Sequence, residues 1–219
     1  MPKCRKCGRE AWVKIPWGNT WFCKEHFIEY FERKVWRTFT KYVPKTHKRV
    51  LLAVSGGKDS LALLYSLAPK LIRENYSVSV LHVDLGITGY SEYARRVVEI
   101  AASEVGVELI VYSLAEREGF TIDSVAAVAK AGDINKPVCS LCGVVKRYVY
   151  NSVAVKQCFD LVVTGHNLDD VFAFAVSDLA TGNVRDLIKL KPYLPSDSYF
   201  VARAKPLFFN YELENALYT

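Results

Sequence analysis

The stretch Val54-Ser55-Gly56-Gly57-Lys58-Asp59-Ser60 joins a short apolar segment, residues 50–54, to a Leu- and Ala-rich segment, residues 61–72. The first segment predicts a buried strand and the second a helix. Adjacent glycines let backbone amides approach an anion, and the start of a helix adds unpaired amides and the positive end of its dipole. The stretch therefore predicts a phosphate-binding loop, with a glycine turn before a capped helix as the alternative. Its spacing matches neither the Walker A loop nor the Rossmann fingerprint.

Strand-like and helix-like segments alternate through the rest of the chain. This alternation predicts an α/β fold with a parallel, doubly wound sheet, in which ligands bind beyond the carboxyl ends of the strands. The predicted strands are residues 50–54, 78–83, 108–112 and 161–164, and the predicted helices are residues 61–72, 92–105, 122–131, 143–155 and 169–180.

Two pairs of metal-ligating side chains lie at the start of the chain, Cys4-x2-Cys7 and, after fifteen further residues, Cys23-x2-His26. Each spacing lets a tight turn direct two ligands at one ion, and four such ligands close the tetrahedral shell of a structural Zn²⁺. A module of about 26 residues buries too little apolar surface to fold without such an ion. We predict a zinc-binding module over residues 1–28; the alternative is two accidental pairs, one of them redox-active.

The positive charge is concentrated in the first quarter of the chain. Residues 1–49 carry 13 Lys and Arg against 4 Asp and Glu, a net +9, whereas the remaining residues carry 16 against 19, a net −3, which leaves the total at +6. Apolar side chains at helical spacing predict a helix from about residue 22 to residue 42, ended by Pro44. We predict a basic linker helix over residues 29–48 that contacts a nucleic-acid backbone, with a solvated spacer as the alternative. Its cationic side chains are Arg33, Lys34, Arg37 and Lys41.

The sequence predicts neither a membrane segment nor a secreted protein. The longest wholly apolar run, residues 171–176, is far shorter than the ~20 residues that span a bilayer, and the basic N-terminus lacks the apolar stretch of a signal peptide. We therefore expect a cytoplasmic protein, whose six cysteines are metal ligands or reactive thiols before disulfides.

Residues 55–60, Ser-Gly-Gly-Lys-Asp-Ser, resemble the signature of the PP-loop ATP pyrophosphatases, which cleave ATP to AMP and pyrophosphate while adenylating a substrate oxygen. With three further stretches and the zinc module, the chain resembles the tRNA 2-thiouridine synthetases, relatives of the tRNA 2-thiocytidine synthetases, over essentially its whole length. The resemblance implies that residues 49–219 form a PP-loop ATP-binding catalytic domain. The three stretches are Asp84-Leu85-Gly86-Ile87, Cys139-Ser140-Leu141-Cys142-Gly143-Val144-Val145-Lys146-Arg147 and Thr164-Gly165-His166-Asn167-Leu168-Asp169-Asp170.

The family resemblance implies an ATP-dependent tRNA sulfurtransferase, which adenylates the C2 oxygen of a uridine and replaces it with sulfur. Ala53 and His82 would lie against the adenosine, Lys58 and Asp59 would act in catalysis, and Asp170 would hold Mg²⁺ on the pyrophosphate. The implied partners are tRNA, a sulfur donor or sulfur-carrier protein, and a second copy of the chain in a homodimer. The implied nucleotide-binding residues are Ala53, Ser55, Gly56, Gly57, Lys58, Asp59, Ser60, His82, Lys146, Gly165 and Asp170.

Cys139 and Cys142 open a predicted helix, and Lys136, Lys146 and Arg147 surround them with positive charge that favours thiolates. Three uses fit the residues alone: a redox or persulfide-carrying pair, two ligands of an iron–sulfur cluster, or half a zinc site. The resemblance implies a [4Fe-4S] cluster held by three cysteines, with one iron left open for sulfur.

The third cluster ligand departs from the family pattern. Cys158, the remaining cysteine, precedes a predicted strand and is expected to be a buried, inert thiol. The family places its third ligand and a second zinc site beyond a segment that resembles Ala216-Leu217-Tyr218, whereas this sequence ends at Thr219. Two expectations compete: a piece of a longer chain, or a naturally short homologue that uses two-cysteine chemistry.

Two other classes of function stay open. A ligase resembling tRNA lysidine synthetase would keep the ATP site but would need neither Cys139 nor Cys142. A non-catalytic zinc and RNA-binding module would not need an intact nucleotide loop. The apolar stretch Val171-Phe172-Ala173-Phe174, where the family is more polar, predicts either a core helix or a partner interface.

Overall fold

The computed structural model of the protein describes residues 1–132 and 137–219. Its central sheet has six strands: β3 Arg49–Ala53, β4 Ser77–Asp84, β5 Glu108–Ser113, β6 Leu161–Thr164, β7 Tyr193–Leu194 and β8 Ala202–Ala204. They lie in the order β5-β4-β3-β6-β8-β7; β7 pairs antiparallel with β8, and the other neighbours are parallel. The chain runs outward from β3 to β5 and then returns to the other side of β3 with β6. The predicted doubly wound sheet is therefore confirmed, and its switch point lies between β3 and β6.

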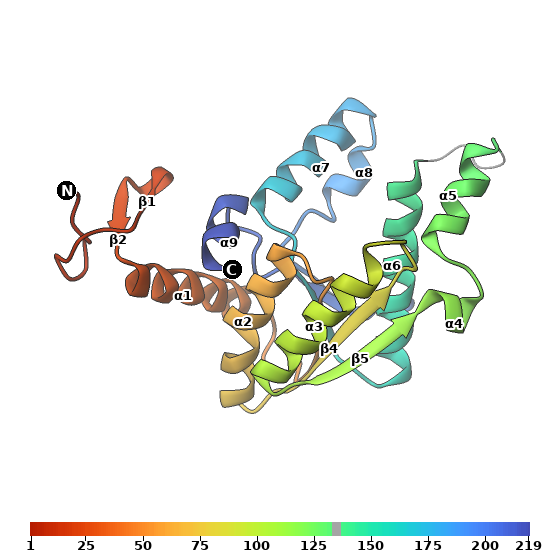
Figure 1. The fold of residues 1–219 in the computed structure, drawn as a ribbon, viewed down its shortest axis with the longest axis horizontal. Coiled ribbons are helices and arrows are strands. Elements are labelled where there is room, and N and C mark those ends of the chain that lie inside the picture. Colours follow the sequence, from red (N-terminus) through yellow and green to blue (C-terminus); the bar gives the residue numbers. More distant parts are fainter. Residues whose placement is uncertain (133–136) are drawn as a thin grey trace.

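Helices cover both faces of this sheet (Figure 1). One face carries α2 and α3, which connect β3 to β4 and β4 to β5, and the other carries α6, which precedes β6. Alternate strand residues serve the two faces: Leu52 packs with α2, whereas Leu51 packs with α6. The helices after β3 are α2 Lys58–Arg73, α3 Ser91–Val105, α4 Leu114–Glu118, α5 Ile122–Lys130, α6 Val138–Lys156, α7 Leu168–Ala180, α8 Val184–Leu187 and α9 Glu212–Tyr218.

The N-terminal module is a small antiparallel hairpin, β1 Val13–Ile15 and β2 Thr20–Phe22, joined by a 3₁₀ turn at Pro16–Gly18. Helix α1, Lys24–Tyr42, follows it and leads into the main body (Figure 1). The helix ends two residues before Pro44, because the residue before a proline favours extended backbone. Its buried side chains, Phe27, Phe31, Val35 and Phe39, share one apolar cluster with α2 and with Ile15 of the hairpin. Helix α1 is therefore packed along the domain and is not a free spacer.

Three local predictions differ from the structure. Helix α6 begins at Val138, so Cys139 lies in its first turn and Cys142 at the start of its second, and neither lies in a preceding loop. Helix α7 is not a core helix, because Phe172, Phe174 and Val176 are exposed. The short elements β7, β8 and α9 were not predicted, since two to seven residues carry too little periodicity. Among the described residues, no helix is both long and apolar enough to cross a membrane.

Candidate functional site

The loop between β3 and α2 lies beyond the carboxyl end of β3 and is braced by its own hydroxyls. Ser60 Oγ accepts a hydrogen bond from the Ser55 amide at 3.1 Å and donates one to the Gly57 carbonyl oxygen at 2.8 Å. Ser60 is buried, so the hydroxyl predicted to meet a phosphate organises the loop in this structure. The Ser55 hydroxyl and the first amides of α2 lie at the same loop, as an anion site requires.

Gly56 is the residue of this loop that tolerates no side chain. Its φ is +86°, and a Cβ would lie 2.9 Å from the backbone oxygen of Ala94. We expect Gly56→Ala to lower the Tm by roughly 2 to 12 °C, since such strain costs about 1–3 kcal/mol. Gly57→Ala is the matched control, because Gly57 has φ −83° and its nearest neighbour would be Ser55 Oγ at 3.7 Å. Thermal melts of both variants without nucleotide test this, and equal Tm values would contradict it.

Two side chains at the start of α2 are held by residues far along the chain. The side-chain amides of Asn167 and Asn215, both buried, donate to Asp59 Oδ1 at 3.1 and 2.8 Å. Lys58 Nζ lies 3.2 Å from Asp59 Oδ2 and 2.7 Å from Glu212 Oε1, and Glu212 raises the pKa of Lys58. The two amides fix one oxygen of Asp59, so the other oxygen faces Lys58 at the loop.

The loop after β6 meets the phosphate loop across the switch point. Asn167 caps α7. Its Oδ1 accepts a hydrogen bond from the backbone N–H of Asp170, and its backbone N–H donates one to Asp170 Oδ2, both at 3.0 Å. A Cβ on Gly165 would lie 3.1 Å from the carbonyl group of Asp59, so glycine lets β6 pack against the start of α2. Gly165 and Asp170 thus position Asn167, which in turn holds Asp59.

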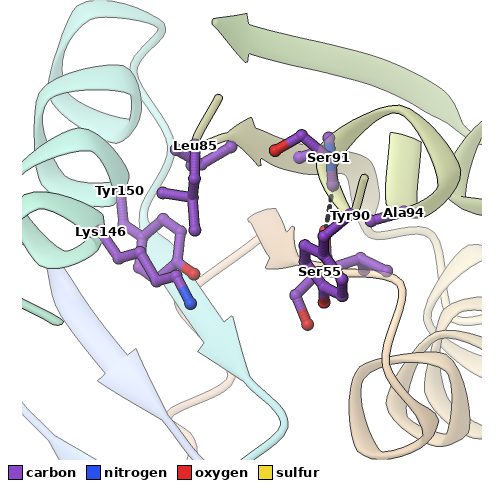
Figure 2. Close-up of a pocket in the computed structure, with 10 residues that line it drawn as sticks. Ser55, Leu85, Tyr90, Ser91, Ala94, Lys146 and Tyr150 are labelled. Atoms are coloured by element: carbon purple, nitrogen blue, oxygen red, sulfur yellow. Dashed lines mark hydrogen bonds between the residues drawn. The ribbon is translucent and has the colours of Figure 1, made fainter. Parts of the chain in front are cut away.

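A pocket opens beside the phosphate loop at the carboxyl ends of β3 and β4. Lys146 and Tyr150 project into it from α6 on one side, and Ser55 and Tyr90 lie on the other (Figure 2). His82 of β4 also lines it. Of the two residues expected against adenosine, His82 lines this pocket, whereas Ala53 does not and Val54, which directly follows β3, does.

His82 lines this pocket with one of its two ring nitrogens hydrogen-bonded. Its Nδ1 lies 3.0 Å from the Val54 carbonyl oxygen, which only accepts, so Nδ1 carries the proton. Nε2 is buried and has no partner among the described residues. Burial lowers the pKa of His82, so the ring is neutral at pH 7 and Nε2 is an acceptor. An acceptor here suits a hydroxyl or amino group of a nucleoside.

The face of α6 that lines the pocket continues toward the cysteine pair. Cys142 is four residues and Cys139 seven residues before Lys146. At 1.5 Å per residue these cysteines lie on the same face, about 6 and 10 Å along the axis from Lys146. Cys139 is exposed and Cys142 is half-buried, so both are open to a reactant. Lys136, predicted to lie near this pair, falls outside the described residues.

A third ligand for a cluster is not found with this pair in the described part of the chain. The one constellation of three or more metal-ligating groups there is in the N-terminal module. Cys158 lies at the far end of α6 with φ +57° and is exposed, so the prediction of a buried thiol is wrong. The residues described supply two of the three cysteines that such a cluster needs.

The four predicted zinc ligands converge. The ligand atoms of Cys4, Cys7, Cys23 and His26 all lie within 4.8 Å of one another. Cys7 Sγ is 3.8 Å from Cys23 Sγ, and His26 Nδ1 is 3.5 and 3.2 Å from the sulfurs of Cys4 and Cys23. Tetrahedral Zn²⁺ with bonds of about 2.0–2.3 Å separates its ligands by roughly 3.3–3.8 Å, so this set fits the ion.

Arg9 lies just outside this set of metal ligands and contacts Cys7. The sequence did not indicate this contact. Its guanidinium lies 3.4 Å from Cys7 Sγ and ion-pairs with Glu25. The Arg9 hydrogen bond is the largest cause of a lowered pKa of Cys7. Such a contact favours the thiolate that binds a metal.

Helix α9 joins the N-terminal module to the phosphate loop. Tyr211, just before α9, stacks on Trp17 of the module with ring centroids 3.7 Å apart. Glu214, fully buried, accepts from Tyr30 at 2.9 Å and pairs with Lys34 at 2.6 Å. Asn215, the next residue, and Glu212, two residues earlier, hold the start of α2. Lys34 is therefore neutralised inside the protein, whereas Arg33, Arg37 and Lys41 of the predicted basic surface are exposed.

The comparison with known proteins agrees with this arrangement. Residues 29–189, which make up most of the chain, match the PP-loop domain family. This chain belongs to the PP-loop family. Residues 3–28 match the N-terminal LIM domain of the 2-thiouridine synthetase TtuA, which places this PP-loop chain in the tRNA 2-thiouridine synthetase branch.

Proteins similar to this PP-loop chain include tRNA 2-sulfurtransferases and a tRNA thiolase. It is 39% identical to a tRNA-5-methyluridine(54) 2-sulfurtransferase of Pyrococcus horikoshii over 99% of its own length and 66% of that protein. It is 35% identical to the Thermotoga maritima protein of the same name, over 99% of this chain and 69% of that one. The U34-tRNA thiolase NcsA of Methanococcus maripaludis, solved with its [4Fe-4S] cluster, superposes with a TM-score of 0.84 at 30% identity, over all of this chain and 70% of that one. The chain thus spans about two thirds of the length of these relatives.

Proposed function

We propose that this chain carries the nucleotide and sulfur-transfer site of an ATP-dependent tRNA 2-thiolation enzyme. The observation that supports it most strongly is one face of α6, which presents Lys146 to the nucleotide pocket and Cys142 and Cys139 one and two turns away. An adenylating site and a sulfur-handling pair on one rigid helix face suit a two-step replacement of oxygen by sulfur. A ligase of the lysidine-synthetase type has no use for such a cysteine pair.

In the first step, the C2 oxygen of a tRNA uridine attacks the α-phosphorus of ATP. The new O–P bond forms as the bond between the α-phosphorus and the bridging oxygen breaks, and pyrophosphate leaves. Lys58 and the loop amides stabilise its charge, Asp59 and Asp170 would hold Mg²⁺, and His82 would accept a hydrogen bond from the nucleoside.

In the second step, a hydrosulfide at Cys139 and Cys142 attacks C2, the C2–O bond breaks and AMP leaves with that oxygen. In the persulfide alternative, the outer sulfur of a persulfide on one cysteine attacks C2 in the same way. The thiolate of the other cysteine then cleaves the S–S bond, which releases the 2-thiouridine and leaves a Cys139–Cys142 disulfide that an external thiol reduces. Cys139 and Cys142 would hold a [4Fe-4S] cluster together with a third ligand, and its open iron would supply bound sulfide. The positive charge of Lys146, between the pair and the pocket, favours the approach of both anions. We further propose that Cys4, Cys7, Cys23 and His26 hold a structural Zn²⁺.

Anaerobic turnover tests this function. Purified protein is incubated with unmodified tRNA, ATP, Mg²⁺, sulfide and lysine, and the nucleosides and nucleotides are quantified by mass spectrometry. We expect 2-thiouridine and AMP in equal amounts. AMP formation with lysine incorporation would favour the ligase, and the absence of ATP binding would favour the non-catalytic RNA-binding module.

A further inference from the structure

A row of cationic side chains lies on the α6 face of the sheet, beside the cysteine pair. In β8, Ala202 and Ala204 point into the α2 side of the core, so Arg203 between them points to the α6 side, next to its partner Val162 of β6. Lys205 follows directly after β8, and its charge interacts with Arg203 and with His166. Asn151 of α6 holds the chain just before β8 through the Val201 amide at 2.9 Å, which places α6 over this strand.

Arg147 brings a third charge to the same place from α6. Its guanidinium folds back along the helix, and a Cβ on Gly143 would lie 3.5 Å from it. Gly143 directly follows Cys142, so this charge lies beside the cysteine pair. Arg147 is exposed, whereas Arg203 and Lys205 are half-buried.

Within residues 1–132 and 137–219, these cations form no ion pair. Among the described residues, no carboxylate oxygen lies within 4.0 Å of the charged nitrogens of Arg147, Arg203 or Lys205. Arg203 Nε is buried without a partner in the same part of the chain, and Lys205 Nζ donates to the Lys189 carbonyl oxygen at 3.2 Å. Asp197 accepts instead from the amides of Tyr199 and Phe200. Lys34, by contrast, is paired with Glu214.

The charges also act on one another. Burial lowers the pKa of Lys205 and Arg203 lowers it further. Burial and then Arg147 lower the pKa of Arg203, which the carboxylate of Asp197 raises by a smaller amount. Burial and then Lys205 lower the pKa of His166. Partly buried like charges without counter-charges destabilise a fold, so a bound anion is the natural counterpart of this cluster.

The position of the cluster separates it from the phosphate loop. The strand order places β8 two strands from β3, and neighbouring strands are about 4.8 Å apart, so Arg203 lies on a strand about 10 Å from the one that carries the loop. Two guanidinium groups and an ammonium group suit the oxygens of a phosphate. The phosphate of an RNA backbone and a phosphate of the nucleotide share this chemistry, and the distance favours the RNA.

We propose that Arg147, Arg203 and Lys205 form a binding site for a backbone phosphate of the substrate RNA, which seats the target nucleotide between the nucleotide pocket and the cysteine pair. This proposal rests on the proposed tRNA substrate. It adds a contact distinct from the exposed basic side chains of α1, because it lies at the reacting base.

Charge-removing variants test the site by binding alone. We expect Arg203→Met and Lys205→Gln each to weaken binding of an unmodified tRNA transcript about tenfold and to reduce the slope of log K against log salt by roughly one. The Kd for ATP with Mg²⁺ should stay within about twofold. The Tm of Arg203→Met should be unchanged or higher, because a half-buried charge without an ion pair is removed. Arg96→Met is the matched control, because Arg96 is an exposed side chain of α3 that pairs with Glu92.

Three results would overturn the RNA site. The first is a tRNA affinity of both variants equal to that of Arg96→Met. The second is weakened ATP binding with unchanged tRNA binding, which would assign the phosphate to the nucleotide. The third is a lower Tm of Arg203→Met together with normal tRNA binding by Lys205→Gln, which would indicate a structural role. Failure of the proposed function is seen separately, in the unaltered protein, as tRNA binding without 2-thiouridine formation.

Discussion

Cys23→Ser is expected to lose the bound Zn²⁺ and to unfold the N-terminal module. Structural zinc contributes about 10–16 kcal/mol in small modules, and a serine hydroxyl does not replace a thiolate ligand. The effect should spread beyond the module, because Cys4, Ile15 and Phe22 share the apolar cluster of α1 and α2. It should also reach the phosphate loop through Trp17, Tyr211 and α9.

Three readouts follow this loss. Zinc content falls from one ion per chain to none, the Tm drops, and tryptophan emission moves to longer wavelength, since three of the four tryptophans, Trp12, Trp17 and Trp21, lie in the module. Cys158→Ser is the control, because Cys158 is exposed and far from the metal ligands. A Cys23→Ser protein that keeps one zinc and melts like Cys158→Ser would contradict the proposed metal site.

Cys139→Ser and Cys142→Ser are expected to abolish 2-thiouridine formation, with a loss on the order of 1000-fold or more, because serine supplies neither a thiolate nor a persulfide. ATP binding should change by less than about twofold, since the cysteines lie one and two helical turns from the pocket residue Lys146. The experiment thus separates sulfur transfer from nucleotide binding.

Product formation and ATP affinity are measured on the same preparations, and Cys158→Ser is again the control. Iron and acid-labile sulfide are measured on anaerobically reconstituted protein. About four of each, lost in both variants, would favour a cluster, whereas zinc alone would favour persulfide chemistry. Full product formation by the double serine variant would contradict the sulfur-transfer proposal and favour a ligase.

Local patterns in the sequence were sufficient for much of this protein. Strand, glycine loop and helix follow one another within residues 49–73, so their contacts span few residues and the residue types alone predict them. The same holds for the metal ligands, because each pair is two residues apart in a tight turn. Cys139, Cys142 and Lys146 also share a face by helical spacing alone.

Contacts between distant segments were decided by the tertiary structure. Asn215 reaches Asp59 across 156 residues, and the neutralisation of Lys34 by Glu214 spans 180. Asn167 carried a detectable signal, an asparagine three residues before an aspartate at a helix start, but this spacing predicts a cap and says nothing of Asp59. Cys158 is exposed because the chain turns there with positive φ, which the apolar residues around it did not indicate.

The sequence by itself thus determined the fold class, the phosphate loop and the metal-ligand set, because each depends on periodicity or spacing within a few turns of chain. The order of the strands decided the rest. It brings β6 beside β3 and β8 beside β6. Only in that order does Asn167 meet the phosphate loop, with Arg203 and Lys205 one strand further along the same sheet, although all three follow that loop by more than a hundred residues. Side chains without an ion pair in the described part of the chain, such as Arg203 in β8, acquire a role only from the surface on which the sheet places them.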